Sequence, residues 1–180
     1  MLVGTAIASA SIVKSLFAPV RRYALSCGLL LIPVAVWNIA LRGSLPPSFA
    51  PAEFDRDIPA PLALTENSLR LAIFALPFLM PLNLRVPGCI RALFVFAAGT
   101  LLYFVSWLAL ILFPSSAWSS NALGFTAPAY TPAMWLLGIA LLGRRLFWGR
   151  FYRWWMYAVL AIAFVAAHVA HTALVFAHIG

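Results

Sequence analysis

Three histidines near the end of the sequence are the residues whose type and spacing most clearly indicate chemistry. His168, His171 and His178 lie in an apolar stretch that runs from Trp154 to Ile179. At about 100° per residue in a helix, all three fall within an arc of about 80° on one face. Two imidazoles three residues apart can approach one metal ion or haem iron, and an imidazole in an apolar environment can also relay a proton.

Three interpretations of this face stay open. In the first, His168 and His171 make structural hydrogen bonds to groups on other helices, such as Asn38 or Ser106. In the second, they bind a metal ion or a haem. In the third, one imidazole is a general base or proton relay. The candidate metal ligands are His168 and His171 with Glu53, Asp55, Asp57 and Glu66, and the candidates for a ligand contact or proton relay are His178, Asn38 and Tyr157.

The acids form a second cluster with possible chemistry. All four carboxylates of the chain lie between residues 53 and 66. Oxygen ligands in such a cluster suit a divalent cation. However, Arg42, Arg56 and Arg70 lie within or beside the same stretch, so the sequence favours ion pairs that fix this segment over a cation site.

The composition places these residues in a membrane protein. Of the 180 residues, 64% are hydrophobic and 9% are charged, and the mean hydropathy is +0.99. A chain with so little polar surface would not stay dissolved as a monomer. Composition therefore excludes a soluble enzyme, a disordered tail, a collagen and a disulfide-stapled secreted domain. We expect one all-α domain over 1–180, a polytopic membrane helical bundle.

Five apolar stretches are long enough, or nearly so, to cross about 30 Å of hydrocarbon. Pro33 lies inside the first, and Pro77 and Pro81 lie inside the second, where we expect kinks because neighbouring helices can satisfy the freed carbonyls. The fourth is short, and an irregular, partly buried lead-in through Gly124–Pro128 would extend it. The predicted spans are 23–41, 69–84, 92–113, 129–143 and 154–179.

Two segments outside the spans have their own predicted roles. Residues 1–22 are expected to form a short interfacial or cytoplasmic helix. Residues 43–68 contain five prolines and are too few to bury a core, so we expect an ordered cap on the outer side of the bundle. Within this cap, a short helix is predicted around Leu64–Leu69, with Thr65 as its N-cap.

The distribution of arginines predicts the orientation. Nine basic residues and no acid fall in the segments before the first span, between the second and third, and between the fourth and fifth. By the positive-inside rule, these segments are cytoplasmic, which places the N-terminus inside and the C-terminus outside. The compact chain has no N-x-S/T acceptor, and we favour a bacterial cytoplasmic (inner) membrane.

The basic residues also bear on partners. They are scattered between apolar runs, so a nucleic-acid partner is not expected. Alanines along the fifth span favour close helix packing, either within the monomer or in a homo-oligomer or with another membrane subunit. The one dense basic run is a candidate contact for anionic lipid headgroups and consists of Arg144, Arg145, Arg150 and Arg153.

The function expected from the sequence is an accessory, scaffold or assembly subunit of the inner membrane, because the chain has no nucleotide loop and no cofactor fingerprint. One alternative is a membrane-embedded metal- or haem-dependent enzyme built on His168 and His171. The other is a small transporter or channel component lined by Asn38, Asn83, Ser106 and the histidines.

The orientation yields a testable prediction. An odd number of spans places the two ends of the chain in different compartments, so tags on the two ends should differ in their reactivity toward a membrane-impermeant reagent. Labelling of the C-terminal tag alone from the outside is the expected result. Labelling of both tags from the same side would contradict the five-span topology.

Overall fold

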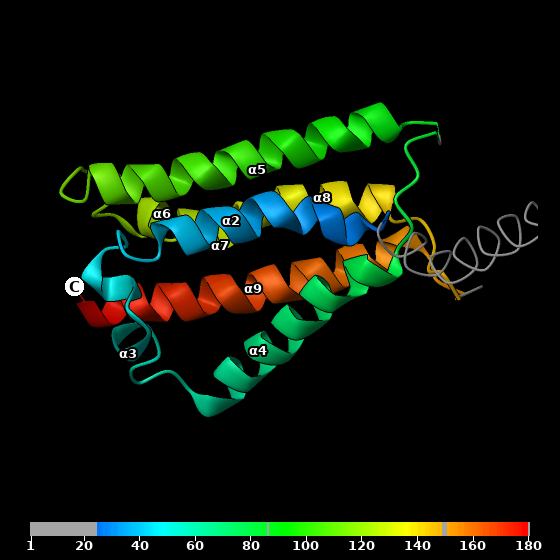
Figure 1. The fold of residues 1–180 in the computed structure, drawn as a ribbon. Helices are drawn as coiled ribbons and strands as arrows, with labels where there is room; N and C mark the ends of the chain where they lie inside the picture. The colour runs from blue at the N-terminus through cyan, green and yellow to red at the C-terminus, as the bar shows by residue number, and fades with distance from the viewer. Residues whose placement is uncertain (1–24, 86, 149–150, 180) are drawn as a thin grey trace, which may run out of the picture.

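The computed structural model describes residues 25–85, 87–148 and 151–179, and every regular element in this part of the chain is helical (Figure 1). In chain order the elements are η1 (Cys27–Leu31), α2 (Ile32–Leu41), η2 (Pro47–Phe49), α3 (Pro51–Phe54), α4 (Ala60–Ala75), η3 (Leu76–Leu79), α5 (Cys89–Leu112), α6 (Ala122–Phe125), α7 (Ala127–Tyr130), α8 (Pro132–Leu142) and α9 (Trp154–Ile179).

The long elements run back and forth between two ends of an elongated bundle. In Figure 1, α2, α5, α8 and α9 lie roughly parallel, and α4 diverges from α9 toward the end that carries α3. The described parts of the two loops that follow η3 and α8, residues 80–85, 87–88, 143–148 and 151–153, hold arginines and no acid and lie at the opposite end. In the described chain, these two basic loops and the acidic cap are therefore at opposite ends of the bundle.

Three helices of the described chain are long and apolar enough to cross a membrane, and they cover Ala60–Leu79, Cys89–Leu112 and Trp154–Ile179. Two shorter apolar helices cover Cys27–Leu41 and Ala127–Leu142. Many large apolar side chains point outward from these helices, including Ile90 at 80% and Ile39 at 76% exposure. Outward-facing apolar surface on this scale fits a helical bundle with lipid around it.

The second predicted span, 69–84, is wrong at both limits. The helix begins at Ala60, with Pro61 in its first turn, and the predicted separate helix at 64–69 is the middle of α4. Thr65 is no N-cap, because its hydroxyl donates to the Pro61 carbonyl at 2.7 Å within the helix. Ser68 bonds in the same way to Leu64 O. Hydroxyl groups that donate to the carbonyl one turn back let polar residues continue a helix. The polar composition of this stretch therefore does not indicate that the helix already begins at Ala60.

The prolines lie where the helices change type or end. Pro33 occupies the first turn of α2, directly after the 3₁₀ turn η1. After Ala75 the α-helix gives way to the 3₁₀ turn η3, which contains Pro77 and ends at Leu79. Pro81 follows in an extended bridge with Ser26. The first helix accordingly begins at Cys27, and the part of its predicted range at 23–24 lies outside the described residues.

The other spans agree more closely with the prediction. α5 covers most of 92–113, and α9 has the predicted limits. The irregular lead-in to the fourth span consists of the short helices α6 and α7, which precede α8. The cap is shorter than predicted and covers the residues between α2 and α4. The predicted N-terminal segment 1–22 lies outside the described residues.

The closest helix packing lies between α5 and α8 and depends on two glycines. A Cβ at Gly138 would lie 2.6 Å from Phe96 Cα, and one at Gly99 would overlap the Trp135 backbone nitrogen. Small residues of this kind let two backbones approach in a membrane bundle. The close packing of α5 on α8 holds Trp135 in the core.

We expect Gly138→Ala to lower the free energy of unfolding by about 1–3 kcal/mol, because the added methyl group must push the two backbones apart. Gly43→Ala is the matched control, since a Cβ there meets nothing within 4 Å. The measurement is unfolding of the purified protein in detergent. Equal stability of the two variants would contradict this account of the packing.

Candidate functional site

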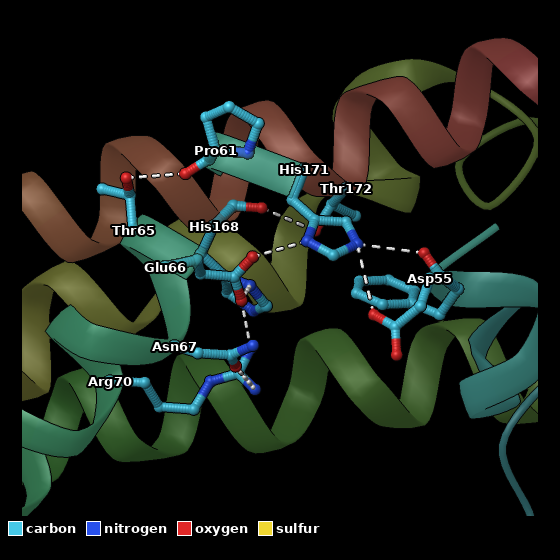
Figure 2. Close-up of polar contacts among 10 residues, drawn as sticks. Asp55, Pro61, Thr65, Glu66, Asn67, Arg70, His168, His171 and Thr172 are labelled. Atoms are coloured by element: carbon cyan, nitrogen blue, oxygen red, sulfur yellow. Dashed lines mark hydrogen bonds and ion pairs between the residues drawn. The ribbon is translucent and has the colours of Figure 1, made fainter. Parts of the chain in front are cut away.

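A buried carboxylate stands where α4 meets α9. The side chain of Glu66 is 1% exposed, and three side chains contact it (Figure 2). His168 Nδ1 lies 2.9 Å from Oε1, and His171 Nδ1 lies 2.6 Å from Oε2. The Arg70 guanidinium also donates to Oε1. A carboxylate withdrawn from water requires such partners, so these contacts are what permit its burial.

Helical spacing explains how the cluster is assembled. Arg70 follows Glu66 by one turn of α4, at the i,i+4 spacing that places two side chains on one face. Its guanidinium also bonds to Asn67 Oδ1 at 3.2 Å. His168 and His171 are three residues apart on α9, so both imidazoles face α4. Phe164, a further turn back, stacks on the His168 ring with 5.4 Å between centroids.

The second nitrogen of His171 binds the cap. His171 Nε2 lies 2.9 Å from the carbonyl oxygen of Phe54, the last residue of α3. The Phe54 ring stacks on the imidazole with centroids 4.6 Å apart. Asp55 follows, with its carboxylate 3.8 Å from Nε2 and its side chain 72% exposed. His171 therefore joins α4, α9 and the cap at one point.

The hydrogen bonds of His171 define how many protons the cluster holds. Both of its ring nitrogens face oxygen acceptors, Glu66 Oε2 on one side and Phe54 O on the other. A neutral imidazole has only one N–H donor. To satisfy both contacts, either His171 is an imidazolium or Glu66 carries a proton on Oε2. The Glu66–His171 pair thus shares one proton beyond those of a carboxylate and a neutral imidazole.

Two cavities adjoin the cluster. The outer cavity, of about 330 Å³, lies between the cap, α4 and α9, and Glu66, Asn67 and His171 are among its lining residues. The central cavity, of about 250 Å³, lies deeper and is lined by residues of α2, α4, α5, α7, α8 and α9. Three residues line both cavities: Arg70, Trp107 and His168.

The candidates for a ligand contact or relay are dispersed. Asn38 lines the central cavity, and its Oδ1 accepts a hydrogen bond of 2.7 Å from the Tyr103 hydroxyl. Tyr157 is buried and donates to Ile73 O at 2.9 Å, which ties α9 to α4 away from the histidines. His178 is exposed and lines a separate surface pocket with Glu53. The structure brings only Asn38 near the cluster.

The remaining acids also differ in their positions. Glu53 forms an exposed ion pair of 2.7 Å with Arg56, as the ion-pairing interpretation expects. Asp57 lies in a turn with a φ of +55° and does not contact the cluster. The polar partners predicted for the histidines are wrong: Ser106 bonds to Tyr103 O, while both imidazoles bind Glu66.

The candidate metal site stays a prediction. Within the described ranges, no group of three or more His, Cys, Asp or Glu side chains is arranged to hold a metal ion. The Nδ1 atoms of His168 and His171 are both directed at the same carboxylate, and Nε2 of His171 is directed at a carbonyl oxygen. This arrangement favours an ion-pair and proton network over coordination of a metal or haem by these nitrogens.

The candidate lipid-contacting arginines lie at the opposite end of the bundle. Arg144 donates to Pro87 O at 3.0 Å and to Leu141 O at 3.3 Å, so it joins two loops. Arg145 and Arg153 are exposed, and Arg150 lies outside the described residues. Asn83 belongs to this end as well, where its side chain accepts from the Arg85 N–H.

Sequence reasoning missed the aromatic walls of the cavities. Phe54, Tyr103, Trp107 and Trp135 were not among the candidates. Tyr103 and Trp107 are four residues apart in the cleanest apolar stretch, which places them on one face of a helix. The pair Glu66 and Arg70 has the same spacing, and a helix drawn from Ala60 onward would have revealed it.

Comparison with protein-family models, with curated protein sequences and with solved structures found no match for this chain.

Removal of the central carboxylate should be strongly destabilising. Glu66→Ala leaves Arg70 and the imidazoles without their shared acceptor, and we expect a loss of about 3–5 kcal/mol in the free energy of unfolding. Glu53→Ala breaks an exposed ion pair and should change stability by less than about 1 kcal/mol. Unfolding of both variants in detergent measures the difference. A Glu66→Ala protein as stable as Glu53→Ala would show that the cluster contributes little to the fold.

Proposed function

We propose that this protein is a multi-pass membrane protein of the bacterial inner membrane and a small transporter or channel component. In this proposal, Glu66 and His171 bind and release the proton that they share. The observation that carries it is a buried carboxylate and imidazole in hydrogen-bond contact beside a cavity to which six helical elements contribute. Ionisable residues inside a membrane bundle characteristically mark ion or proton pathways.

The proposed topology has five spans, with the N-terminus inside and the C-terminus outside. Its support is the gathering of basic loops at one end of the bundle and of all four acids toward the other. The two shorter apolar helices, Cys27–Leu41 and Ala127–Leu142, supply the remaining crossings beside the three long ones. On this orientation the cap and the outer cavity face the extracytoplasmic side.

The fourth segment also supports a transport role, because it contributes to the wall of the central cavity. Pro128 on α7 and Pro132 on α8, on either side of Thr131, line this cavity.

The energetics of the cluster favour the same role. A buried ion pair costs desolvation free energy that its attraction only partly repays, and an apolar replacement of similar shape is often as stable. Glu66 and His171 are 1% and 4% exposed. The charged and titratable groups around them are Arg70 on α4, His168 on α9 and Asp55 at the end of the cap helix. For a scaffold or assembly subunit, apolar packing of similar shape would supply comparable stability.

The test is proton flux in proteoliposomes that contain the full chain and a pH-sensitive dye. A potassium diffusion potential drives protons inward, alone or together with gradients of small solutes. The wild-type protein should move protons faster than empty liposomes do, and Glu66→Gln should lower the rate by about tenfold or more, because an amide cannot bind the proton.

Glu53→Gln is the matched control, since this carboxylate lies in the same half of the bundle but outside the cluster. Its flux should equal that of the wild type. Flux that persists in Glu66→Gln would contradict the role of this carboxylate, and the absence of any protein-dependent flux would contradict transport.

A further inference from the structure

One charged side chain, Arg70, lines the central cavity. Among its lining residues, Arg70 is the only one that carries a formal charge at neutral pH with the imidazole neutral, and no acid lines it. Glu66, the partner of Arg70, lines the outer cavity only. In the described part of the chain, Arg70 donates hydrogen bonds to Glu66 and Asn67. Since a guanidinium has five N–H donors, three are left for a further acceptor.

The other polar groups of this cavity are mainly donors as well. The indole N–H group of Trp135 is buried and has no hydrogen-bond partner in the described part of the chain. Trp135 as a whole is only 2% exposed. A buried donor without an acceptor carries a desolvation cost, and such a group calls for an explanation such as an absent ligand or water. Arg70 and the Trp135 indole together favour an acceptor-rich occupant.

The rest of the wall is apolar and limits the size of the occupant. Phe74 on α4 and Phe164 on α9 line it together with Val34, Pro128 and Pro132. A volume of about 250 Å³ is slightly below the range of about 300–1,000 Å³ that is typical of small-molecule sites. The walls therefore suit a small molecule with a flat or compact apolar body.

We infer that the central cavity binds a small monocarboxylate, with its carboxylate on Arg70 and its apolar body among the aromatic side chains. A carboxylate matches the planar donors of a guanidinium and can accept two parallel hydrogen bonds from it. Arg70 then bridges Glu66 and the ligand. The proton shared by Glu66 and His171 offsets the second negative charge, so the inference rests on the proposed function and names its substrate class.

Benzoate, benzamide and benzylamine are suitable probes because they share one ring and differ in charge. Their binding to the detergent-solubilised full chain is measured by isothermal titration calorimetry at a fixed neutral pH. Benzoate should bind at least about tenfold more tightly than benzamide, since only the carboxylate forms charge-assisted hydrogen bonds to the guanidinium. Benzylamine, a cation, should not bind.

Two variants locate the site. Arg70→Gln should weaken benzoate binding by at least about tenfold, because it removes the charged donor. Arg42→Gln is its control, since Arg42 is exposed and lines neither cavity. Val34→Phe narrows the central cavity from α2 without a change in the Glu66 cluster, and it should also weaken benzoate binding. This second variant decides the matter if Arg70→Gln does not fold.

The outcomes separate this inference from the proposed function. Failure of the wild type to bind benzoate, equal affinity for benzoate and benzamide, or unchanged benzoate binding in both Val34→Phe and Arg70→Gln would each overturn the inference. Proton flux in proteoliposomes would then still support transport of another solute. Benzoate binding with the expected variant effects but without any proton flux would support the carboxylate site and overturn transport.

Discussion

The structure depends on the hydrogen-bond donors that surround one buried carboxylate. Glu66 is the only acid among the buried residues of the described chain, and its two oxygens are satisfied from two helices. Because Arg70 and the two imidazoles must approach the same side chain, α4 and α9 are held in one register. The cap is fixed by the same device, since Phe54 and Asp55 meet His171 from its other edge. The contacts of Glu66 and His171 thus determine helix packing, cap docking and the proton content of the site together.

Much of the fold follows from the sequence in physical terms. The uninterrupted apolar run of α5 and the aromatic and apolar run of α9 identify helices because few alternatives satisfy the backbone in lipid. α4 was misjudged at its start because Thr65, Glu66 and Ser68 lower its hydropathy, although hydroxyl bonds and ion pairing let a helix accommodate them. The sequence predicts Pro33, Pro77 and Pro81 inside spans, whereas Pro33 and Pro77 lie where the helix changes between 3₁₀ and α and Pro81 lies beyond the end of η3.

The same reasoning from the sequence predicts only part of the site. Helical periodicity places His168 and His171 on one face, and the sequence names Glu66 and Arg70 as charged candidates. Which acid reaches the imidazoles depends on the crossing of α4 over α9, a contact between residues about a hundred positions apart. The cavities are harder still, because Trp107 and Trp135 become their walls only when α5 packs closely on α8 at Gly99 and Gly138. A glycine in an apolar run does not by itself predict such a close contact between helices.

The unequal lengths of α2 and α9 have a consequence for the surrounding bilayer. The 26 residues of α9 span about 39 Å, while the 10 residues of α2 span about 15 Å and its preceding 3₁₀ turn adds about 10 Å. Against hydrocarbon of about 30 Å, the longer helix has to tilt and the shorter one leaves a deficit of several ångströms. On the proposed five-span topology, lipid beside α2 is then thinner than lipid beside α9, and the thickness of the host membrane becomes a variable of the protein's stability.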